Sequence, residues 1–322
     1  MLLSVKDLCV KYVTFEGIVH AVNGVSFDIP ERGTLGLVGE SGAGKTTTAL
    51  SLMRLIPVPP GIVERGKISF EGRDLDALSG EEMKKIRGNR ISMIFQDPMT
   101  SLNPVLTVGL QIAETIAAHQ NMSEREAMKK AREMLEKVQI PAARYKEYPH
   151  EFSGGMRQRV GIAMALACNP RMIIADEPTT ALDVTIQAQV IELMRDLRDE
   201  FSTAMMLITH DLGVVGEVCD RVAVMYAGEI VEEGSLEQIF EHARHPYTNG
   251  LFRCIPDIDE DNSRIQPISG LMPDPCDLPA GCCFHPRCPE CMEICRTRKP
   301  APFTENGQMV RCCLYTRGGA GQ

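Results

Sequence analysis

The chain has 322 residues, and 44% of them are apolar, which is enough for one large domain or two smaller ones with a substantial core. Its formal net charge of −9 argues against a nucleic-acid-binding protein, because such proteins usually present a basic surface. The first residues do not form an export signal, and no apolar run reaches the about 18 residues of a membrane span. At a membrane, we therefore expect the chain to act as a peripheral subunit.

Apolar patterns predict alternating strands and helices over most of the chain. Strands are expected at residues 3–10, 22–29, 34–38, 91–95, 172–175, 204–209 and 221–226, and helices at 45–55 and 184–198. Residues 100–165 read as largely helical, with a capping box formed by Ser123 and Glu126. This alternation predicts an α/β core with an inserted helical block. After His245 the chain becomes rich in proline and cysteine and loses periodicity, which predicts a boundary between residues 245 and 246.

A glycine-rich stretch, GESGAGKT, lies between the predicted strand 34–38 and the helix that follows it. It fits the pattern G-x-x-x-x-G-K-[ST], in which backbone N–H groups and a helix N-terminus surround phosphate. Lys45 would reach the β- and γ-phosphates of a nucleotide, and the Thr46 hydroxyl would hold Mg²⁺. A chance glycine-rich turn is the alternative, and the flanking strand and helix disfavour it. The expected nucleotide-binding residues are Gly39, Glu40, Ser41, Gly42, Ala43, Gly44, Lys45, Thr46 and Thr47.

Polar residues follow three of the predicted strands. Asp176 and Glu177 come after the strand at 172–175, where Asp176 would accept a Mg²⁺-bound water and Glu177 would act as general base. Gln96 ends the strand at 91–95, and its amide could contact Mg²⁺ or the attacking water. His210 ends the strand at 204–209 and could reach the γ-phosphate. Alone, each is more often a structural or surface residue, but a phosphate loop in the same chain favours function, with Thr46, Gln96 and Asp176 around the magnesium.

A second glycine turn, FSGGMRQR at residues 152–159, starts a helical pattern but lacks a lysine. The order of GESGAGKT, Gln96, FSGGMRQR, MIIADE, ALD at 181–183 and His210 closely resembles that of the ATP-binding cassette (ABC) ATPases, the motors of ABC transporters. The resemblance extends from about residue 2 to residue 234. It implies a P-loop NTPase core with an inserted α-helical subdomain, and hydrolysis of ATP with Mg²⁺.

The resemblance also assigns roles to individual residues. It identifies Gln96 as the Q-loop glutamine, Asp183 as the D-loop aspartate, His210 as the switch histidine, and Ser153, Gly154 and Gly155 as the signature turn. In this family the signature turn binds the γ-phosphate of ATP held by a second subunit, which explains the missing lysine. Met156 departs from the commoner glutamine, a change that also occurs in the peptide-importer branch. Tyr12 aligns with the aromatic residue that stacks on adenine, and Phe15 is a nearby competitor.

Three further stretches resemble the oligopeptide, dipeptide and nickel importer ATPases. They are residues 97–112, HPYTNGL at 245–251 and the cysteine-rich tail. We therefore expect an ATPase domain at 1–245, a C-terminal extension at 246–322, and a place on the cytoplasmic face of the membrane. The implied partners are a second ABC ATPase, expected to be a paralogue, two membrane permeases and an extracytoplasmic substrate-binding protein, with no nucleic acid.

Most of the 12 cysteines gather near the C-terminus. The pattern of the importer branch picks out Cys282, Cys288, Cys295 and Cys312, which in some members hold a [4Fe–4S] cluster. Four thiolates suit an iron–sulfur cluster or zinc, and Cys288 with Cys291 forms a CPEC knuckle that also suits zinc. We expect the cluster, with zinc, or thiols that bind no metal, as the alternatives.

Two other functions compete with the importer reading. One is a soluble ABC-type ATPase in DNA repair or iron–sulfur assembly, which the acidic charge and the importer-like stretches disfavour. The other is a redox-responsive binding module that no longer catalyses. The presence of Lys45, Asp176, Glu177 and His210 argues against that reading.

Overall fold

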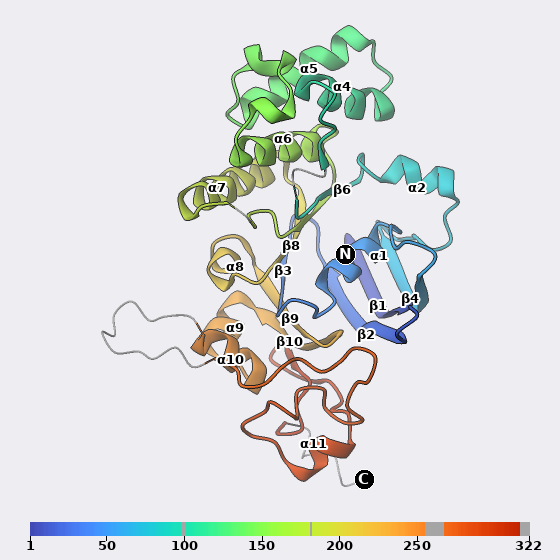
Figure 1. Cartoon of the computed structure of the whole chain (residues 1–322), viewed down its shortest axis with the longest axis vertical. Coiled ribbons are helices and arrows are strands. Elements are labelled where there is room, and N and C mark those ends of the chain that lie inside the picture. The colour runs from blue at the N-terminus through green and yellow to red at the C-terminus, as the bar shows by residue number, and fades with distance from the viewer. Residues whose placement is uncertain (98–100, 181, 255–266, 316–322) are drawn as a thin grey trace. The chain divides into compact units, whose positions relative to one another are not determined.

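The computed structural model describes residues 1–97, 101–180, 182–254 and 267–315 (Figure 1). The chain splits into two compact units. The first comprises Met1–Leu2, Ile29–Thr34 and Glu71–Thr209, and the second comprises Leu3–Asp28, Leu35–Phe70 and His210–Gln322. None of the helices in these described ranges has the length and apolar character of a membrane-spanning segment.

The second unit contains two groups of strands. The first group has the order β2-β1-β4, formed by β1 (Leu3–Val13), β2 (Ile18–Ile29) and β4 (Gly61–Phe70). The second group has the order β11-β12-β10-β9-β3, formed by β3 (Thr34–Val38), β9 (Arg221–Tyr226), β10 (Glu229–Ser235), β11 (Phe303–Glu305) and β12 (Gln308–Val310). β3 pairs with β9 in parallel, and the other pairs of this group are antiparallel. The C-terminal part of the chain is thus built into the sheet that carries the phosphate loop.

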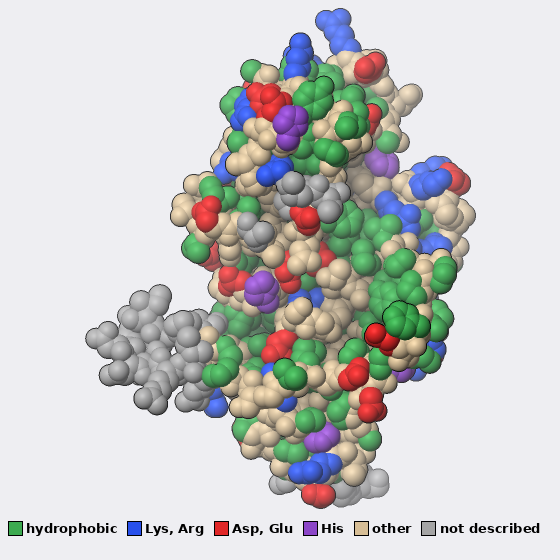
Figure 2. Space-filling view, viewed as in Figure 1, with side chains coloured by type: hydrophobic (Ala, Val, Ile, Leu, Met, Phe, Trp, Pro, Cys, Tyr) green, Lys and Arg blue, Asp and Glu red, His purple; other side chains and the backbone are tan. Residues whose placement is uncertain are grey.

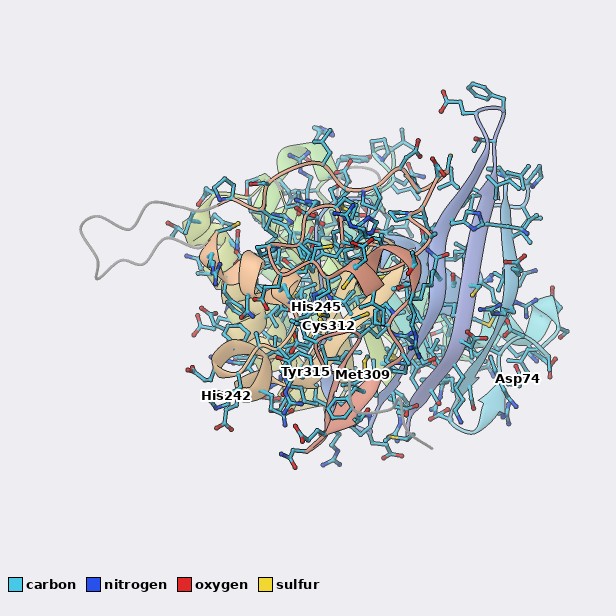
Figure 3. The ribbon with its side chains drawn as sticks, turned by 90° about the horizontal axis from the view of Figure 1, so that it is seen from below. Asp74, His242, His245, Met309, Cys312 and Tyr315 are labelled. Atoms are coloured by element: carbon cyan, nitrogen blue, oxygen red, sulfur yellow. The ribbon has the colours of Figure 1, made fainter. Side chains whose placement is uncertain are left out.

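Short helices complete this unit: α1 (Lys45–Leu52), α8 (Leu212–Val218), α9 (Leu236–Glu241), α10 (Pro246–Arg253) and α11 (Glu293–Thr297). Its aromatic core joins Tyr226 of β9, Tyr247 of α10 and Phe284, whose ring centroids lie 4.6 to 5.3 Å apart. Figure 3 labels His245, at the start of α10, and Cys312, just after β12, within the same part of this unit. The core therefore ties the tail to the strands.

The first unit is built on parallel strands in the order β8-β7-β6, namely β6 (Ile91–Ile94), β7 (Met172–Asp176) and β8 (Ala204–Thr209). Every residue of β7 and β8 is buried, as expected for parallel strands covered on both faces. Its other elements are β5 (Arg73–Asp74), α2 (Gly80–Ile86), α4 (Val108–His119), α5 (Glu124–Lys137), α6 (Gly154–Leu166), α7 (Val184–Phe201) and the 3₁₀ turns η1 (Ala142–Lys146) and η2 (Pro149–Glu151). Figure 1 shows α4, α5 and α6 packed together.

The predicted strands are confirmed, and β3, β8 and β9 have the predicted ends. The capping box of Ser123 and Glu126 is also present at the start of α5. β4 escaped prediction because most of its positions are exposed and show no alternation. Although apolar periodicity is lost after His245, the chain continues into helix α10, which begins with Pro246 and is capped by the His245 side chain.

Candidate functional site

The predicted phosphate loop joins β3 to α1, and its backbone leaves no room for side chains at two glycines. A Cβ atom at Gly39 would lie 2.1 Å from the carbonyl oxygen of Met225. At Gly44, where φ is 100°, a Cβ atom would lie 2.2 Å from the carbonyl oxygen of Ala21. The N-cap residue of α1 is Gly44, which has no side chain to cap the helix. The loop therefore presents backbone N–H groups at a helix N-terminus, which suits an anion.

Lys45 brings a positive charge into this loop. Its side chain is buried, and its Nζ donates hydrogen bonds to the carbonyl oxygens of Gly39 at 2.7 Å and Glu40 at 3.0 Å. Thr46, the next residue of α1, is exposed. The arrangement fits a polyphosphate with its magnesium ion.

The two aromatic candidates for adenine stacking differ in their surroundings. The Tyr12 hydroxyl lies 3.3 Å from Oγ1 of Thr47, beside the first turn of α1. Phe15 is 98% exposed between β1 and β2. Figure 2 shows hydrophobic side chains on the surface of the strand group β2-β1-β4. The exposed hydrophobic residues of this group include Val13 and Ile62. Proximity to the phosphate loop favours Tyr12.

In the first unit, the structure brings together two residues that the sequence placed only at separate strand ends. Gln96 donates from Nε2 to Oε2 of Glu177 at 3.0 Å, and the Thr180 hydroxyl donates to the same oxygen at 2.9 Å. Glu177 has a φ of 46°, an uncommon conformation for a residue with a side chain, and its N–H donates to the Ile208 carbonyl at 2.8 Å. Asp176, at the end of β7, is 2% exposed. The carboxylate of Glu177 is thus oriented by two side-chain donors.

The second glycine turn lies at the start of α6. Oγ of Ser153 accepts a hydrogen bond from the Met156 N–H and caps the helix. A Cβ atom at Gly155 would lie 2.4 Å from Cγ2 of Ile186 in α7, so α6 and α7 approach closely there. The carboxylate of Asp183 caps α7 by accepting from the Ile186 N–H at 3.1 Å. Of the predicted ALD segment, residue 181 lies outside the described residues.

His210 belongs to the second unit. Together with Gly39 and Glu40 it lines a pocket of about 290 Å³ whose other walls are mostly apolar, formed by Val38, Leu212, Leu251, Cys254, Pro267 and Ile268. The structure therefore places the predicted histidine beside the start of the phosphate loop.

The cysteines of the predicted metal site are neighbours. Cys282, Cys288 and Cys312 each interact electrostatically with Cys295. Burial raises the pKa of Cys282 to about 12 and those of Cys288 and Cys312 to about 11, and the neighbouring thiols add to the rise. Within the described ranges, however, no group of three or more His, Cys, Asp or Glu side chains is placed to hold a metal ion.

Comparisons with known proteins identify the family. The model of the ABC transporter family matches residues 22–180, and that of the oligopeptide/dipeptide transporter C-terminal region matches residues 231–295. The oligopeptide transport ATP-binding protein AppD of Bacillus subtilis (strain 168) is 51% identical, over 100% of this chain and 99% of that protein. The chain belongs to the ATP-binding proteins of the ABC oligopeptide and dipeptide transporters.

Other relatives agree with this membership. The dipeptide transport ATP-binding protein DppD of Bacillus subtilis (strain 168) is 50% identical, over 98% of this chain and 92% of that protein. A dimeric structure of an ATP-binding cassette in a post-hydrolysis state with ADP and Pi is 30% identical, with a TM-score of 0.65 over 73% of this chain and 98% of that one. The predicted mixed α/β ABC ATPase fold and the ATPase activity of the family are thereby confirmed. The alternative of an ATPase for DNA repair or iron–sulfur assembly is not favoured.

The predicted [4Fe–4S] cluster on Cys282, Cys288, Cys295 and Cys312 is not supported by these findings. The comparisons give no sign of it, and the described thiols form no metal-holding group. The physical reason is that cysteine spacing along the chain limits the distances between sulfur atoms only loosely.

Sequence reasoning about this ABC ATPase missed two residues that contact the candidate site, Arg144 and Thr180. Arg144 contacts the residues just before the signature turn: it donates to the Glu151 carbonyl at 3.2 Å and lies over the Phe152 ring at 4.3 Å. Its guanidinium also lies 3.3 Å from the Met156 sulfur. Thr180, only three residues after Glu177, could have been recognised from its place beside the carboxylates. Arg144 carries no such signal, because its contacts depend on how η1 and η2 fold.

Proposed function

We propose that this ABC ATPase powers an importer of dipeptides or oligopeptides, or of nickel. The observation that carries this proposal is the similarity over nearly the whole chain to oligopeptide and dipeptide transport proteins, including the part matched by their C-terminal region. Similarity to the ABC transporter family alone would support an ATPase of a transporter without indicating which substrate is transported.

In this function the phosphate loop binds MgATP. Lys45 contacts the β- and γ-phosphates, Tyr12 stacks on adenine, and Thr46, Gln96 and Asp176 surround the magnesium. Glu177 activates the attacking water, and His210 senses the γ-phosphate. The burial of Lys45 inside the loop and the two hydrogen bonds to the Glu177 carboxylate support these roles.

The signature turn acts on a second subunit. The γ-phosphate of the partner's ATP is bound by Ser153, Gly154 and Gly155. Asp183 lies at the same interface between the two subunits. Ser153 caps α6, and the first two residues of the helix are glycines. A helix N-terminus without bulky side chains suits phosphate binding. The dimeric cassette of similar fold supports pairing, and we propose a paralogue as the partner.

We further propose that residues 1–245 form the ATPase domain, with residues 100–165 as its inserted signature subdomain. Residues 246–322 would form the cysteine-rich extension. A division into two parts is supported by two separate family models, which match residues 22–180 and 231–295; the second match begins before residue 246. Two permeases and an extracytoplasmic binding protein would complete the transporter, with this subunit peripheral on the cytoplasmic face of the membrane. Residues 97–112, part of which lie outside the described residues, would contact a permease.

The [4Fe–4S] cluster on Cys282, Cys288, Cys295 and Cys312, with zinc as its alternative, stays a prediction supported by the sequence pattern alone. Iron and sulfide analysis of anaerobically purified protein, with its visible absorption, tests it. Stoichiometric zinc without iron would refute the cluster, and the absence of both metals would refute either site.

Reconstitution tests the transport function. The complete transporter is placed in proteoliposomes, and phosphate release and uptake are measured with peptide-loaded or empty binding protein. We expect the loaded protein to stimulate hydrolysis and peptide uptake. Uptake of a nickel chelate alone would overturn the peptide assignment, and hydrolysis without any uptake would overturn the importer function.

A further inference from the structure

Glu40, the second residue of the phosphate loop, is held by two residues far along the chain. Arg287 forks onto its carboxylate, with Nη1 2.6 Å from Oε2 and Nη2 3.0 Å from Oε1. The Glu40 N–H donates to the Tyr247 hydroxyl at 3.0 Å. Both the side chain and the backbone of one loop residue are thus bound by the C-terminal part of the chain.

The Arg287 guanidinium is oriented by contacts other than that with Glu40. Its side chain is only 5% exposed. Its Nε donates to the Ser269 carbonyl at 3.1 Å, and Nη2 donates to the Ile268 carbonyl at 3.3 Å. Nη1 also lies 3.5 Å from the Tyr226 hydroxyl. Because a planar guanidinium with these neighbours has little freedom, its fork points at one carboxylate.

Tyr247 is equally constrained. It is fully buried at the start of α10, and its ring packs against Tyr226 at 4.6 Å and Phe284 at 5.3 Å. The His245 side chain accepts from the Tyr247 N–H at 3.0 Å and caps the helix. The hydroxyl is therefore delivered to the Glu40 N–H by a rigid core.

Glu40 connects these contacts to the candidate phosphate site. Its carbonyl oxygen accepts from Nζ of Lys45, and it lines the same pocket as His210. A free carboxylate at this position would repel a polyphosphate, and a displaced Glu40 carbonyl would shift the lysine. A guanidinium bound to both carboxylate oxygens neutralises that charge.

We propose that Arg287 and Tyr247 are positioning residues of the phosphate loop, through which the C-terminal part of the chain sets the affinity for nucleoside triphosphates. The inference rests on the proposed function of the loop. Without the Arg287 guanidinium, the Glu40 carboxylate carries an unneutralised charge beside the bound phosphates. The extension thereby contributes to the nucleotide site without contacting the nucleotide.

The test measures MgATP binding by the full chain for Arg287→Met, Glu40→Gln and the double variant, with Lys45→Ala as the probe of the loop itself. Arg296→Met, in the same segment but with a 63% exposed side chain, is the matched control. We expect Arg287→Met to weaken binding about tenfold, which corresponds to about 1.4 kcal/mol, and Arg296→Met to leave it unchanged. The double variant should bind more tightly than Arg287→Met, because it no longer carries an unpaired carboxylate at residue 40.

The outcomes separate the inference from the function on which it rests. Affinities are referred to folded protein, measured by circular dichroism, so that lost stability alone does not count. Wild-type affinity in Arg287→Met, together with lost binding in Lys45→Ala, would overturn the positioning role and leave the proposed function standing. Wild-type affinity in Lys45→Ala would overturn the phosphate site itself. If Arg287→Met does not fold, Tyr247→Phe, which removes only the hydroxyl, should weaken binding, and unchanged binding would count against the inference.

Discussion

The side-chain amide of Gln96 donates a hydrogen bond to the Glu177 carboxylate, with 3.0 Å between Nε2 and Oε2. The residues are 81 positions apart, at the ends of neighbouring parallel strands. A glutamine that orients the candidate general base can link the loop after β6 to the state of the hydrolytic site.

Glu177→Gln should trap ATP without turnover. The amide keeps the shape of the side chain but cannot accept the proton of the attacking water, so hydrolysis should fall at least about 100-fold. Phosphate release by the assembled transporter measures this, and nucleotide binding should persist. Hydrolysis at the wild-type rate would show that another group acts as the base.

Lys45→Ala should abolish nucleotide binding in practice. The variant removes the ammonium that Gly39 and Glu40 hold inside the loop, and a charge-assisted hydrogen bond contributes about 1.5–3 kcal/mol. Titration of the purified chain with MgATP measures the affinity. Lys84→Ala, at a 69% exposed lysine paired with Glu81, is the control and should bind normally.

Two glycines of α6 should respond in opposite ways to alanine. Gly155→Ala forces a Cβ atom to within 2.4 Å of Ile186, and overpacking of this kind costs about 1–3 kcal/mol. Gly161→Ala meets nothing within 4 Å and should stabilise the helix by about 0.5–1 kcal/mol. Denaturant unfolding measures both.

The same pair of variants tests the signature turn. Gly155→Ala should also lower hydrolysis by the assembled transporter, because it displaces the N-terminus of α6, while Gly161→Ala should not. Adding Ile186→Ala to Gly155→Ala makes room for the methyl group and should restore part of both losses. Equal effects of the two single variants would contradict the role assigned to the α6–α7 contact.

The stability of the chain should fall in mild acid because of His245. Burial lowers the pKa of His245 from 6.5 to about 3, so the folded state holds a neutral ring while the unfolded chain binds a proton below about pH 6.5. The contribution of the neutral His245 ring to the free energy of unfolding is therefore fully present above pH 6.5. It is lost as the pH falls toward 3, at about 1.4 kcal/mol per pH unit.

His245→Asn provides the comparison, since asparagine can still cap α10 but does not titrate. Urea unfolding at several pH values between 5 and 7.5 should give a steeper loss for the wild type than for the variant. Parallel curves would mean that His245 does not carry this linkage. The Glu232 carboxylate, which accepts a hydrogen bond from the His245 backbone N–H, is present in both proteins.

Local patterns explain what could be predicted. β3 and β8 are short apolar runs, and the glycines of the phosphate loop follow from the backbone that a strand-to-helix turn requires. β4 could not be found, because an exposed strand carries no apolar alternation. The metal prediction from Cys282 to Cys312 failed to gain support for a related reason: spacing along the chain does not set the distances between side chains.

The sequence by itself determined the order of the motifs, the strand and helix that flank the phosphate loop, and the family that this order indicates. These depend on short segments whose chemistry is local. Only the tertiary structure decided that Arg287 binds Glu40 and that Gln96 donates to Glu177. It also decided that residue 155 must be a glycine to leave room for Ile186. The physical reason is that such contacts join residues far apart in the chain, and they exist only once the intervening strands and helices have packed.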